Sequence, residues 1–383
     1  MTVRRVVKLG LALVVALALV VIVALAGGGW YVSGILKTDG FLVNRSDPEP
    51  DLVVAAIGDD QVTLEITPQT DEDGDWRRDG IWGLVPDVGY SQVGAVLEIT
   101  DQHVVREFFP LSGDLEVGDM VRLEHYAFPD DPLTAFGLAY EEVRYSSPLG
   151  DFPAWFLDAS GDIWAIFVHG KGGTRREALR MLPGAVELGF PSLVITYRND
   201  EEAPKSASGL YGYGQTEWQD LEGAASYAAD HGASGFVLVG YSMGGAIVLN
   251  FLYRSPLAER VRGAILDAPM VDFNATVDLG GRERGLPRPF VVASKAIAQL
   301  RFGVDWGKLD YLKRADELSA PILLLHGDAD KKVPVRTSDA LAKARPDIVQ
   351  YVRFDDTGHV LGWNTNRAAY EAAVTGFLQG LSE

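Results

Sequence analysis

Hydrophobic residues are most densely gathered near the N-terminus of the chain. Residues 9–26 are almost purely Leu, Val, Ala and Ile, and no charged residue stands between Lys8 and Lys37. A helix rises about 1.5 Å per residue, so a run of this length spans roughly 27 Å, close to the thickness of a bilayer core. Trp30 and Tyr31 follow where an interfacial aromatic belt would lie. The pattern predicts a transmembrane anchor over residues 1–33.

Two other interpretations of this apolar segment stay open. Ala24-Leu25-Ala26 fits the cleavage site of a signal peptide, which would release the rest of the chain for secretion. The apolar cores of signal peptides are usually about 7–15 residues long, shorter than this one, so an uncleaved anchor is favoured. A soluble helix this apolar would need cover on all sides. The basic residues before the run predict a cytoplasmic N-terminus and an extracytoplasmic remainder.

The pattern changes after the apolar segment. Residues 34–51 are predicted to be a linker, because residues 44–50 are polar and contain Pro48 and Pro50. Over residues 52–140, short runs of β-forming residues are separated by turn residues. The runs 52–57 and 61–66 flank Gly58-Asp59-Asp60 and predict a hairpin, and 95–99 and 120–124 continue the pattern. We interpret this segment as a small β-rich module whose residues suggest no chemistry.

From residue 141 to residue 383, apolar runs alternate with amphipathic ones. A strand pair is predicted at 141–145 and 154–158, followed by strands at 164–169, 192–197, 236–239, 261–266, 322–326 and 349–354. Helices are predicted at 175–188, 218–231, 243–253, 337–344 and 367–381. This alternation is typical of an α/β fold with a mostly parallel, doubly wound sheet covered on both faces. In such sheets, sites lie at the carboxyl ends of the strands.

One insertion interrupts this alternation. About fifty residues separate the strands that end at 266 and begin at 322, which is too long for an ordinary loop. The insertion contains a helical run near 290–300 and several aromatic and apolar residues. We predict a small lid over about residues 270–318, whose apolar groups Phe302, Trp306, Leu309 and Tyr311 either contact substrate or pack an extra helix.

Composition excludes several classes of function. The chain has 383 residues with a formal net charge of -19, which argues against nucleic acid as a partner because phosphate binding needs clustered cations. It has no cysteine, so thiolate catalysis and Cys-based metal sites are excluded. Its six histidines are not closely paired in sequence. We therefore expect no His-cluster metal site, and the serine chemistry described below needs neither a metal nor an organic cofactor.

The sequence GYSMGG at residues 240–245 has the chemistry of a nucleophile. It lies between the predicted strand 236–239 and the predicted helix 243–253, and it contains the G-x-S-x-G pattern of a nucleophile elbow. A sharp turn at this point lifts the hydroxyl of Ser242 above the sheet edge. The backbone N–H of Met243 then points to where an oxyanion would form. The alternative is a glycine-rich turn whose serine has no catalytic role. Other motifs in the chain are needed to distinguish the two interpretations.

A serine nucleophile needs a base, and the base needs an acid to orient it. Downstream of Ser242, His326 ends a predicted strand and His359 lies in a loop after the last predicted strand. Asp328 and Asp330 follow His326. The chain order Ser242, Asp330, His359 is the order expected for a serine on this kind of elbow.

In these residues the chain resembles the serine-hydrolase branch of the α/β-hydrolase superfamily. The resemblance rests on GYSMGG at 240–245, HGDADKKVP at 326–334 and TGH at 357–359, and it covers about residues 141–383. Within that branch the arrangement resembles membrane-attached or secreted members of the serine-aminopeptidase and monoacylglycerol-lipase-like group or of the BEM46-like group. The resemblance implies a triad of Ser242, His359 and Asp330, with Asp330 preferred to Asp328 and with His326 in a structural role.

The same resemblance implies a second oxyanion donor. The sequence HGKGG at 169–173 is similar to the family's His-Gly-x loop, in which the backbone N–H of the third residue is used. This nominates Lys171, with Met243 as its partner, and leaves His169 structural. The Lys171 side chain is either solvated or attracts an anionic substrate group.

The leading functional hypothesis is a membrane-anchored serine hydrolase that cleaves acyl esters, with lipid-like esters suggested by the anchor and the lid. A peptidase or acyl-aminopeptidase on the same fold is one alternative. A catalytically silent binding protein, with recognition by the β-rich module, is another, because a fold does not determine a function. A dehalogenase is disfavoured, since it would need a carboxylate in place of Ser242. The expected partners are a small-molecule or lipid-like acyl substrate and the membrane.

Overall fold

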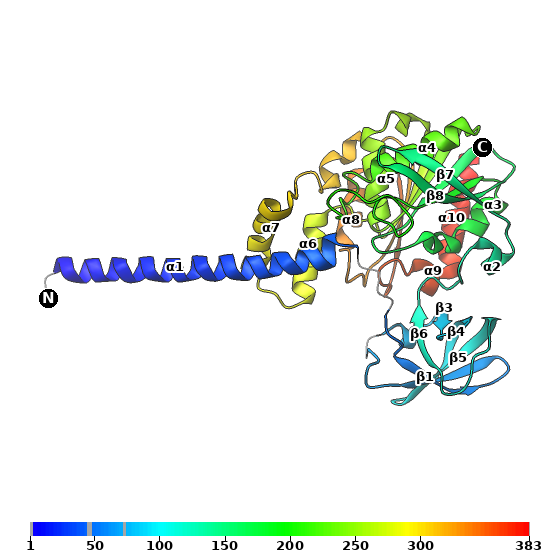
Figure 1. Ribbon diagram of the computed structural model, residues 1–383, viewed down its shortest axis with the longest axis horizontal. Coiled ribbons are helices and arrows are strands. Elements are labelled where there is room, and N and C mark those ends of the chain that lie inside the picture. Colours follow the sequence, from blue (N-terminus) through cyan, green and yellow to red (C-terminus); the bar gives the residue numbers. More distant parts are fainter. Residues whose placement is uncertain (1–2, 44–47, 72–73, 383) are drawn as a thin grey trace.

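The computed structural model describes residues 3–43, 48–71 and 74–382 (Figure 1). Three parts follow one another along the chain: a long N-terminal helix, a small barrel and a large α/β domain. The helix projects from the α/β domain, and the barrel lies beneath that domain in the same view.

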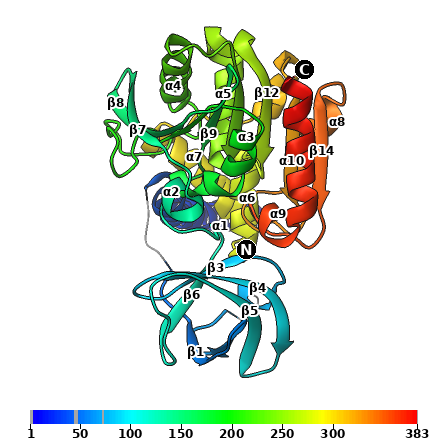
Figure 2. The ribbon, with the colours of Figure 1, turned by 90° about the vertical axis from the view of Figure 1, so that its right-hand side faces the viewer.

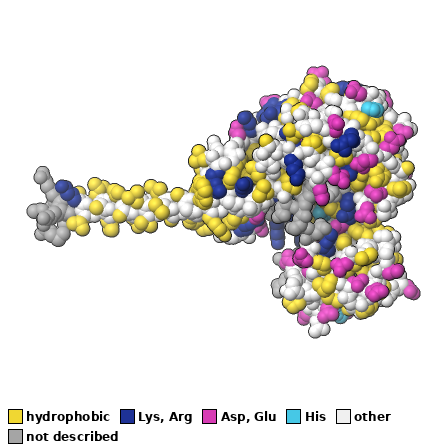
Figure 3. All heavy atoms as spheres, viewed as in Figure 1, with side chains coloured by type: hydrophobic (Ala, Val, Ile, Leu, Met, Phe, Trp, Pro, Cys, Tyr) yellow, Lys and Arg dark blue, Asp and Glu magenta, His cyan; other side chains and the backbone are white. Residues whose placement is uncertain are grey.

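The N-terminal helix α1 (Val3–Ile35) runs without a break through the whole apolar segment. Within the described residues, one helical stretch, Val7–Phe41, is long and apolar enough to cross a membrane, and its most apolar window is entirely exposed. The apolar surface is visible in Figure 3 as a yellow rod. The helix includes Gly27, Gly28 and Gly29, ends at Ile35, two residues beyond the predicted anchor, and passes into the short π-helix Leu36–Phe41.

Part of the predicted linker over 34–51 is therefore helical and packed. Phe41 is 4% exposed and lies edge-on against Tyr213 and Phe273, with ring centroids 5.9 and 5.5 Å away. The Tyr211 N–H donates to the Phe41 carbonyl at 2.8 Å, and Leu42 forms a β-bridge with Leu210. One buried aromatic side chain ties this segment to the α/β domain. Residues 44–47 of the predicted linker lie outside the described residues.

The β-rich module is a closed barrel. Its six strands are β1 (Leu52–Ile57), β2 (Gln61–Ile66), β3 (Trp82–Val85), β4 (Tyr90–Ile99), β5 (His103–Ser112) and β6 (Met120–Glu124), in the order β1-β2-β5-β4-β3-β6. The predicted hairpin is present as antiparallel β1 and β2. Alternate residues point inward and form a separate core around Trp82, Val93 and Val104. Closure removes the free strand edges that would otherwise pair with other chains.

The α/β domain is built on one mixed sheet of eight strands. These are β7 (Glu141–Ser147), β8 (Gly150–Leu157), β9 (Ile163–Val168), β10 (Ser192–Ile195), β11 (Gly235–Tyr241), β12 (Val261–Asp267), β13 (Ile322–Gly327) and β14 (Val349–Phe354). The order is β14-β13-β12-β11-β9-β10-β8-β7. Neighbours from β14 to β10 are parallel, and the predicted pair β7 and β8 forms an antiparallel edge.

Helices cover both faces of this sheet, as Figure 2 shows. Helices α4 (Trp218–Asp230), α5 (Met243–Arg254) and α8 (Arg336–Ala344) share one core with strand residues such as Ile166 and Leu238. Helices α3 (Leu182–Glu187) and α10 (Arg367–Ser382) share the other core with residues such as Phe167 and Val239. The alternation of neighbouring strand residues between two cores explains why these strands are apolar throughout.

The helix predicted at 175–188 is not continuous. The segment forms a 3-10 helix at Arg175–Arg180 and then α3, whose first turn contains Pro183. Proline lacks the N–H that a helix interior requires, so it begins a new helix here rather than continuing the previous one. Two further short helices are α2 (Pro132–Phe136) and α9 (Gly362–Thr365).

The predicted lid contains α6 (Phe273–Glu283), α7 (Arg288–Phe302) and the 3-10 helix Tyr311–Glu317. Helices α6 and α7 lie beside the end of α1 (Figure 1). The later part of the insertion belongs to the main core, since Leu309 and Tyr311 are only 4% and 2% exposed. Of the two interpretations of Phe302, Trp306, Leu309 and Tyr311, packing is the one that the structure supports.

Asn364, on α9, joins the barrel to the α/β domain. Its side-chain amide donates to the carbonyls of Ile81 and His125 at 2.8 and 2.9 Å, and the Ile81 N–H donates to its backbone carbonyl at 3.0 Å. Arg180 donates to the Asn364 side-chain oxygen at 3.1 Å. Asn364 is 1% exposed, so these hydrogen bonds are shielded from water. They hold the segment that follows β6 and begins at His125, here called the exit segment, against the site described next.

Candidate active site

Ser242 stands at a sharp turn between β11 and α5. Its backbone has φ 50° and ψ -112°, a region that non-glycine residues rarely adopt. The turn is held by three backbone hydrogen bonds: the Ser242 N–H donates to the Asp267 carbonyl at 2.9 Å, and the Met270 and Gly245 N–H groups each donate to the Ser242 carbonyl at 3.0 Å. The surrounding chain thus stabilises a strained conformation, as is common where a side chain is presented for chemistry.

The glycines of this turn are required by close approach. A Cβ on Gly244 would lie 2.1 Å from the Val168 carbonyl oxygen, and one on Gly240 would lie 2.7 Å from the backbone of Gly244. These distances leave no room for any side chain. The sequence pattern around Ser242 therefore reflects the packing of β11 and α5 on the end of β9.

Ser242, His359 and Asp330 form one hydrogen-bonded chain. Ser242 Oγ lies 2.8 Å from His359 Nε2, and His359 Nδ1 lies 2.6 Å from Asp330 Oδ2. His359 comes from the loop between β14 and α9, and Asp330 from the loop after β13. The structure brings together the three residues that the sequence selected. If Nδ1 carries the proton that Asp330 accepts, Nε2 is left to accept the proton of Ser242.

His326 is a further partner of this group, with a contact that sequence reasoning missed. Its Nε2 lies 3.0 Å from Asp330 Oδ2, and its Nδ1 lies 2.7 Å from Ser338 Oγ. Because Asp330 can only accept, Nε2 is the donor, and Nδ1 accepts the Ser338 hydroxyl proton. The backbone N–H groups of Lys332 and Val333 donate to Asp330 Oδ1 at 2.7 and 2.8 Å.

These four hydrogen bonds keep Asp330 ionised. Burial alone would raise the pKa of Asp330. The charge of His359 and the hydrogen bonds from His326 and His359 outweigh burial, so the pKa of Asp330 lies well below its ordinary value. Asp328 has a different role, since its Oδ1 accepts the Asp356 N–H at 2.8 Å and so fixes the loop that leads to His359.

The loop after β9 lies directly against Ser242. A Cβ on Gly170 would be 3.2 Å from the Ser242 Cβ. The Gly170 N–H donates to Glu177 Oε2 at 2.6 Å, and the Gly172 N–H donates to the Tyr211 hydroxyl at 3.2 Å. Within the described chain, the Lys171 N–H between them has no hydrogen-bond acceptor. Met243 is the first residue of α5, where a backbone N–H has no partner inside the helix.

A buried ion pair supports this loop from below. His169 Nε2 lies 2.8 Å from Asp200 Oδ2, and His169 Nδ1 lies 2.8 Å from the Gly170 carbonyl oxygen. Both ring nitrogens face acceptors, so both are donors and the imidazole is charged. Burial would lower the pKa of His169, but the charge of Asp200 and these two hydrogen bonds outweigh it and raise the pKa.

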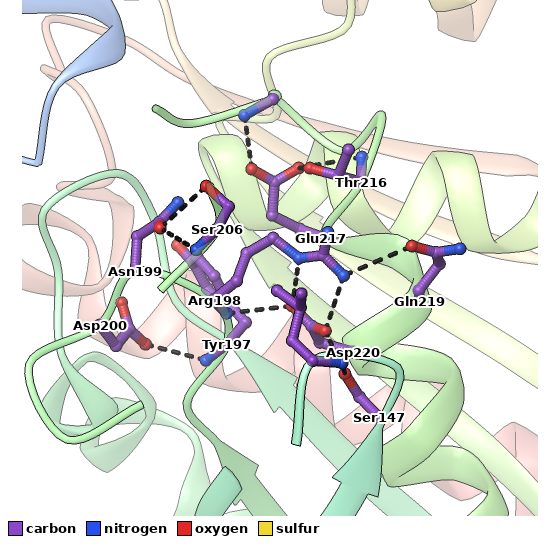
Figure 4. A network of polar contacts seen from close by, with 12 residues as sticks. Ser147, Tyr197, Arg198, Asn199, Asp200, Ser206, Thr216, Glu217, Gln219 and Asp220 are labelled. Atoms are coloured by element: carbon purple, nitrogen blue, oxygen red, sulfur yellow. Dashed lines mark hydrogen bonds and ion pairs between the residues drawn. The ribbon is translucent and has the colours of Figure 1, made fainter. Parts of the chain in front are cut away.

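The loop after β10 carries Asp200 and is itself held by a polar network (Figure 4). Arg198 Nε and Asp220 Oδ2 are 2.7 Å apart, and the Ser147 hydroxyl donates to Asp220 Oδ1 at 2.6 Å. Asp200 also accepts the Tyr197 N–H at 2.9 Å. The loop against Ser242 thus rests on a chain of buried charges that extends to α4.

Ser242 and His359 open into a cavity of about 840 Å³. One wall comes from the barrel and its exit segment, including Asp75, Arg78, His125 and Tyr126. No sequence signal could have found these residues, because they reach the site only through the way the barrel packs. Burial is the main cause that lowers the pKa of His125 well below its ordinary value, so this ring is neutral. Burial likewise lowers the pKa of Lys171, whose side chain also lines the cavity.

The described residues contain no group of three or more His, Cys, Asp or Glu side chains placed to hold a metal ion.

Comparison with known proteins agrees with this fold. Residues 206–382 match the prolyl oligopeptidase family, and residues 53–124 match a domain of unknown function, DUF8805. The esterase Pf2001 from Pyrococcus furiosus is similar in structure: one crystal form has a TM-score of 0.54 and 16% identity, and covers 67% of this chain and 98% of its own. A second crystal form has a TM-score of 0.54 and 17% identity, with 64% and 93% covered.

The chain has the α/β-hydrolase fold, and the family match over residues 206–382 supports a serine hydrolase. A thermophilic esterase from Thermogutta terrifontis also aligns, with a TM-score of 0.48, 19% identity, and 63% of this chain and 100% of its own covered. No curated protein sequence matches the chain. The part of this α/β-hydrolase that matches the prolyl oligopeptidase family starts after β10 and includes Ser242, Asp330 and His359. Its finer grouping with aminopeptidase-like or lipase-like members stays a prediction.

Proposed function

We propose that this α/β-hydrolase cleaves acyl esters through Ser242, His359 and Asp330. The observation that carries the proposal is the hydrogen-bonded chain from Ser242 Oγ through His359 to Asp330, at the apex of the strained turn. A hydrogen bond between nucleophile and base, and a second between base and acid, is the arrangement that activates a serine hydroxyl.

The proposed reaction has two stages. His359 Nε2 takes the Ser242 proton as Oγ attacks the acyl carbonyl, and the C–O bond to the alcohol breaks as His359 returns that proton to the leaving oxygen. Water, deprotonated by His359, then attacks the acyl-enzyme, and the carboxylic acid leaves as Ser242 regains its proton. Asp330 keeps the proton of the His359 ring on Nδ1 and stabilises the imidazolium that forms.

The N–H groups of Lys171 and Met243 are proposed to bind the oxyanion. The support is the position of Lys171, since its neighbours Gly170 and Gly172 have acceptors and its loop lies against Ser242. The first N–H groups of a helix also carry partial positive charge, which favours an anion at Met243. In a well-studied protease, one such donor contributes about 3–4 kcal/mol to the transition state.

We also propose that α1 anchors the enzyme, with its N-terminus in the cytoplasm and its catalytic domain outside. The support is the fully exposed apolar window of the helix and the basic residues Arg4, Arg5 and Lys8 that precede it. Protease protection of the C-terminal residues in sealed inverted vesicles tests the orientation. Digestion of the catalytic domain in those vesicles would contradict it.

A labelling experiment tests the triad. The full-length enzyme in detergent is treated with a fluorophosphonate probe beside Ser242→Ala and His359→Ala. We expect labelling of the wild type and its loss in both variants. A folded wild type that does not react would contradict the proposal and favour a binding protein.

A peptidase is the second candidate, and the match of residues 206–382 to the prolyl oligopeptidase family supports it. Matched substrates that share one acyl group, a 4-nitrophenyl ester and a 4-nitroanilide, separate the two. Catalysed hydrolysis of the ester alone supports an esterase. A kcat/KM for the anilide as high as that for the ester would favour the peptidase.

A further inference from the structure

The end of α1 is packed tightly on the lid. A Cβ on Gly28 would lie 2.3 Å from the ring of Phe290, and one on Gly29 would lie 2.8 Å from the Cβ of Ala293. Small residues of this kind let two helices approach closely. On the same side, Arg301 donates to the Trp30 carbonyl at 3.1 Å and to Ser33 Oγ at 2.7 Å. Helix α7 is therefore docked along the last turns of α1.

This contact lies where α1 would leave the bilayer. About twenty helical residues cross a bilayer core. The uncharged apolar run of α1 begins at Leu9, after Lys8, so this length ends near residue 28, at the glycines that meet α7. Trp30 is 58% exposed and Tyr31 is 70% exposed, as residues of an interfacial belt would be. The lid is thus held at the height of the membrane surface.

The lid also exposes apolar side chains of its own. On α7, Leu300 is 86% exposed and Val292 is 56% exposed. Figure 3 shows hydrophobic side chains continuing from α1 onto the neighbouring part of the α/β domain. A continuous apolar surface on a helix that crosses the membrane and on a lid beside it fits a lipid surface as its neighbour.

The cavity at Ser242 reaches this junction. The last residues of α1 and the start of the π-helix line it together with apolar residues of the lid and with the active site: Val32, Ile35, Leu36, Val277, Leu286, Val291, Ser242 and His359. Residues of the barrel and of the segment that leaves it, with Lys171 and Lys332, form a polar part of the lining. The part beside α1 has an apolar seam along Ile35, Leu36 and Val291. It also carries Glu283 and the pair Arg284 and Asp39, whose charged groups lie 3.0 Å apart.

We propose that the substrate is a long-chain acyl ester of the bilayer, whose chain enters the cavity along the seam between α1 and the lid. This inference rests on the proposed function of Ser242. It makes α1 a determinant of specificity as well as an anchor, since Ile35 and Leu36 contact the chain. The polar leaving group then faces the barrel wall, which carries the hydrogen-bonding groups that an alcohol or headgroup needs.

The test compares two esters that share a leaving group. Full-length enzyme is reconstituted in dioleoylphosphatidylcholine vesicles and assayed with 4-nitrophenyl palmitate in the bilayer and 4-nitrophenyl acetate in the water. The variant is Ile35→Trp, which narrows the seam. The matched control is Val21→Trp, which adds the same ring to a lipid-facing position of the same helix that is 50% exposed.

We expect Ile35→Trp to lower the ratio of palmitate to acetate hydrolysis at least tenfold, and Val21→Trp to leave that ratio unchanged. A ratio unchanged in Ile35→Trp would overturn the proposal, as would an equal fall in both variants. Fluorophosphonate labelling of each variant reports whether Ser242 is intact, and Leu36→Trp serves if Ile35→Trp does not label. Wild type that neither labels nor hydrolyses either ester would instead contradict the proposed function.

Discussion

Removing His326 tests how Asp330 is positioned. His326 Nε2 supplies one of four hydrogen bonds to the Asp330 carboxylate, and the substitution His326→Leu removes that donor at similar volume. Hydrogen bonds to charged groups contribute about 1.5–3 kcal/mol each. The two backbone donors hold Asp330 Oδ1 in either case, so Asp330 loses orientation at Oδ2, where His359 also binds. His326 is thus a positioning residue and not a catalytic one.

The expected loss of kcat is smaller than the loss caused by replacing the acid itself. Deleting the acid of a triad lowers kcat by about 10⁴ in a well-studied protease. Here the acid stays in place with three of four partners, and we expect kcat to fall about tenfold, which corresponds to about 1.4 kcal/mol. We expect KM to stay within a factor of two, because His326 does not line the cavity.

Steady-state hydrolysis of 4-nitrophenyl acetate measures kcat and KM of His326→Leu, and urea unfolding measures its stability. Ser338→Ala is the matched control, because it leaves the imidazole but removes the hydroxyl that fixes its tautomer, and we expect a smaller loss of about threefold. His326→Gln keeps an N–H donor and should recover part of kcat. Loss of stability with an unchanged kcat would refute the reasoning and leave His326 a purely structural residue.

Three further predictions concern the elbow, the buried ion pair and the barrel. In Gly244→Ala the new Cβ would collide with the Val168 carbonyl. We expect the unfolding free energy to fall by about 2–4 kcal/mol and fluorophosphonate labelling to be lost, and an unchanged urea midpoint would contradict this. The raised pKa of His169 gives stability that is full below about pH 6.5 and is lost as pH rises through the raised value. The difference in unfolding free energy between wild type and Asp200→Asn should therefore be largest near pH 6 and shrink toward pH 9, and a constant difference would argue against a charged His169. Asn364→Ala leaves the Ile81 and His125 carbonyls without their side-chain donor. We expect the unfolding free energy to fall by about 2–3 kcal/mol and KM to rise with kcat retained, and an unchanged KM would show that barrel docking does not shape the cavity.

Much of the fold could be predicted because the strands of the α/β domain are short, apolar and separated by amphipathic helices. Helices α4, α5, α8 and α10 begin and end within a residue or two of their predicted limits. Prediction was weaker in the barrel, where β3 and β5 were not identified. Barrel strands alternate inward and outward residues over a few positions, so their signal is weak until the barrel closes. Pro183 indicated that the helix predicted at 175–188 would be interrupted, but the amphipathic pattern of the whole segment favoured one continuous helix.

The site was predictable to the extent that its chemistry is local in sequence. Ser242, Asp330 and His359 each sit in a short motif at the end of a strand, and a parallel sheet brings such ends together. Met243 followed from the same elbow, whereas Lys171 was implied by the resemblance of residues 169–173 to the family's His-Gly-x loop, and both oxyanion roles stay predictions. The contact between His326 and Asp330 required the turn of the loop after β13 to be known. That His125 and Arg78 line the cavity could be known only from the way the barrel packs on the α/β domain, and no motif in either part of the chain predicts that packing.

The packing of Phe41 on the α/β domain would limit how far an enzyme anchored through α1, as proposed above, can act from a membrane. A flexible tether would let a catalytic domain sweep a wide volume above the surface. Here the helical segment continues to Phe41, whose buried ring lies edge-on against the stacked rings of Tyr213 and Phe273. From residue 28 to Phe41 the chain rises roughly 20 Å at helical spacing. An enzyme anchored through α1, as proposed above, would therefore work at a fixed height above the membrane, and substrates far from that surface would be out of its reach.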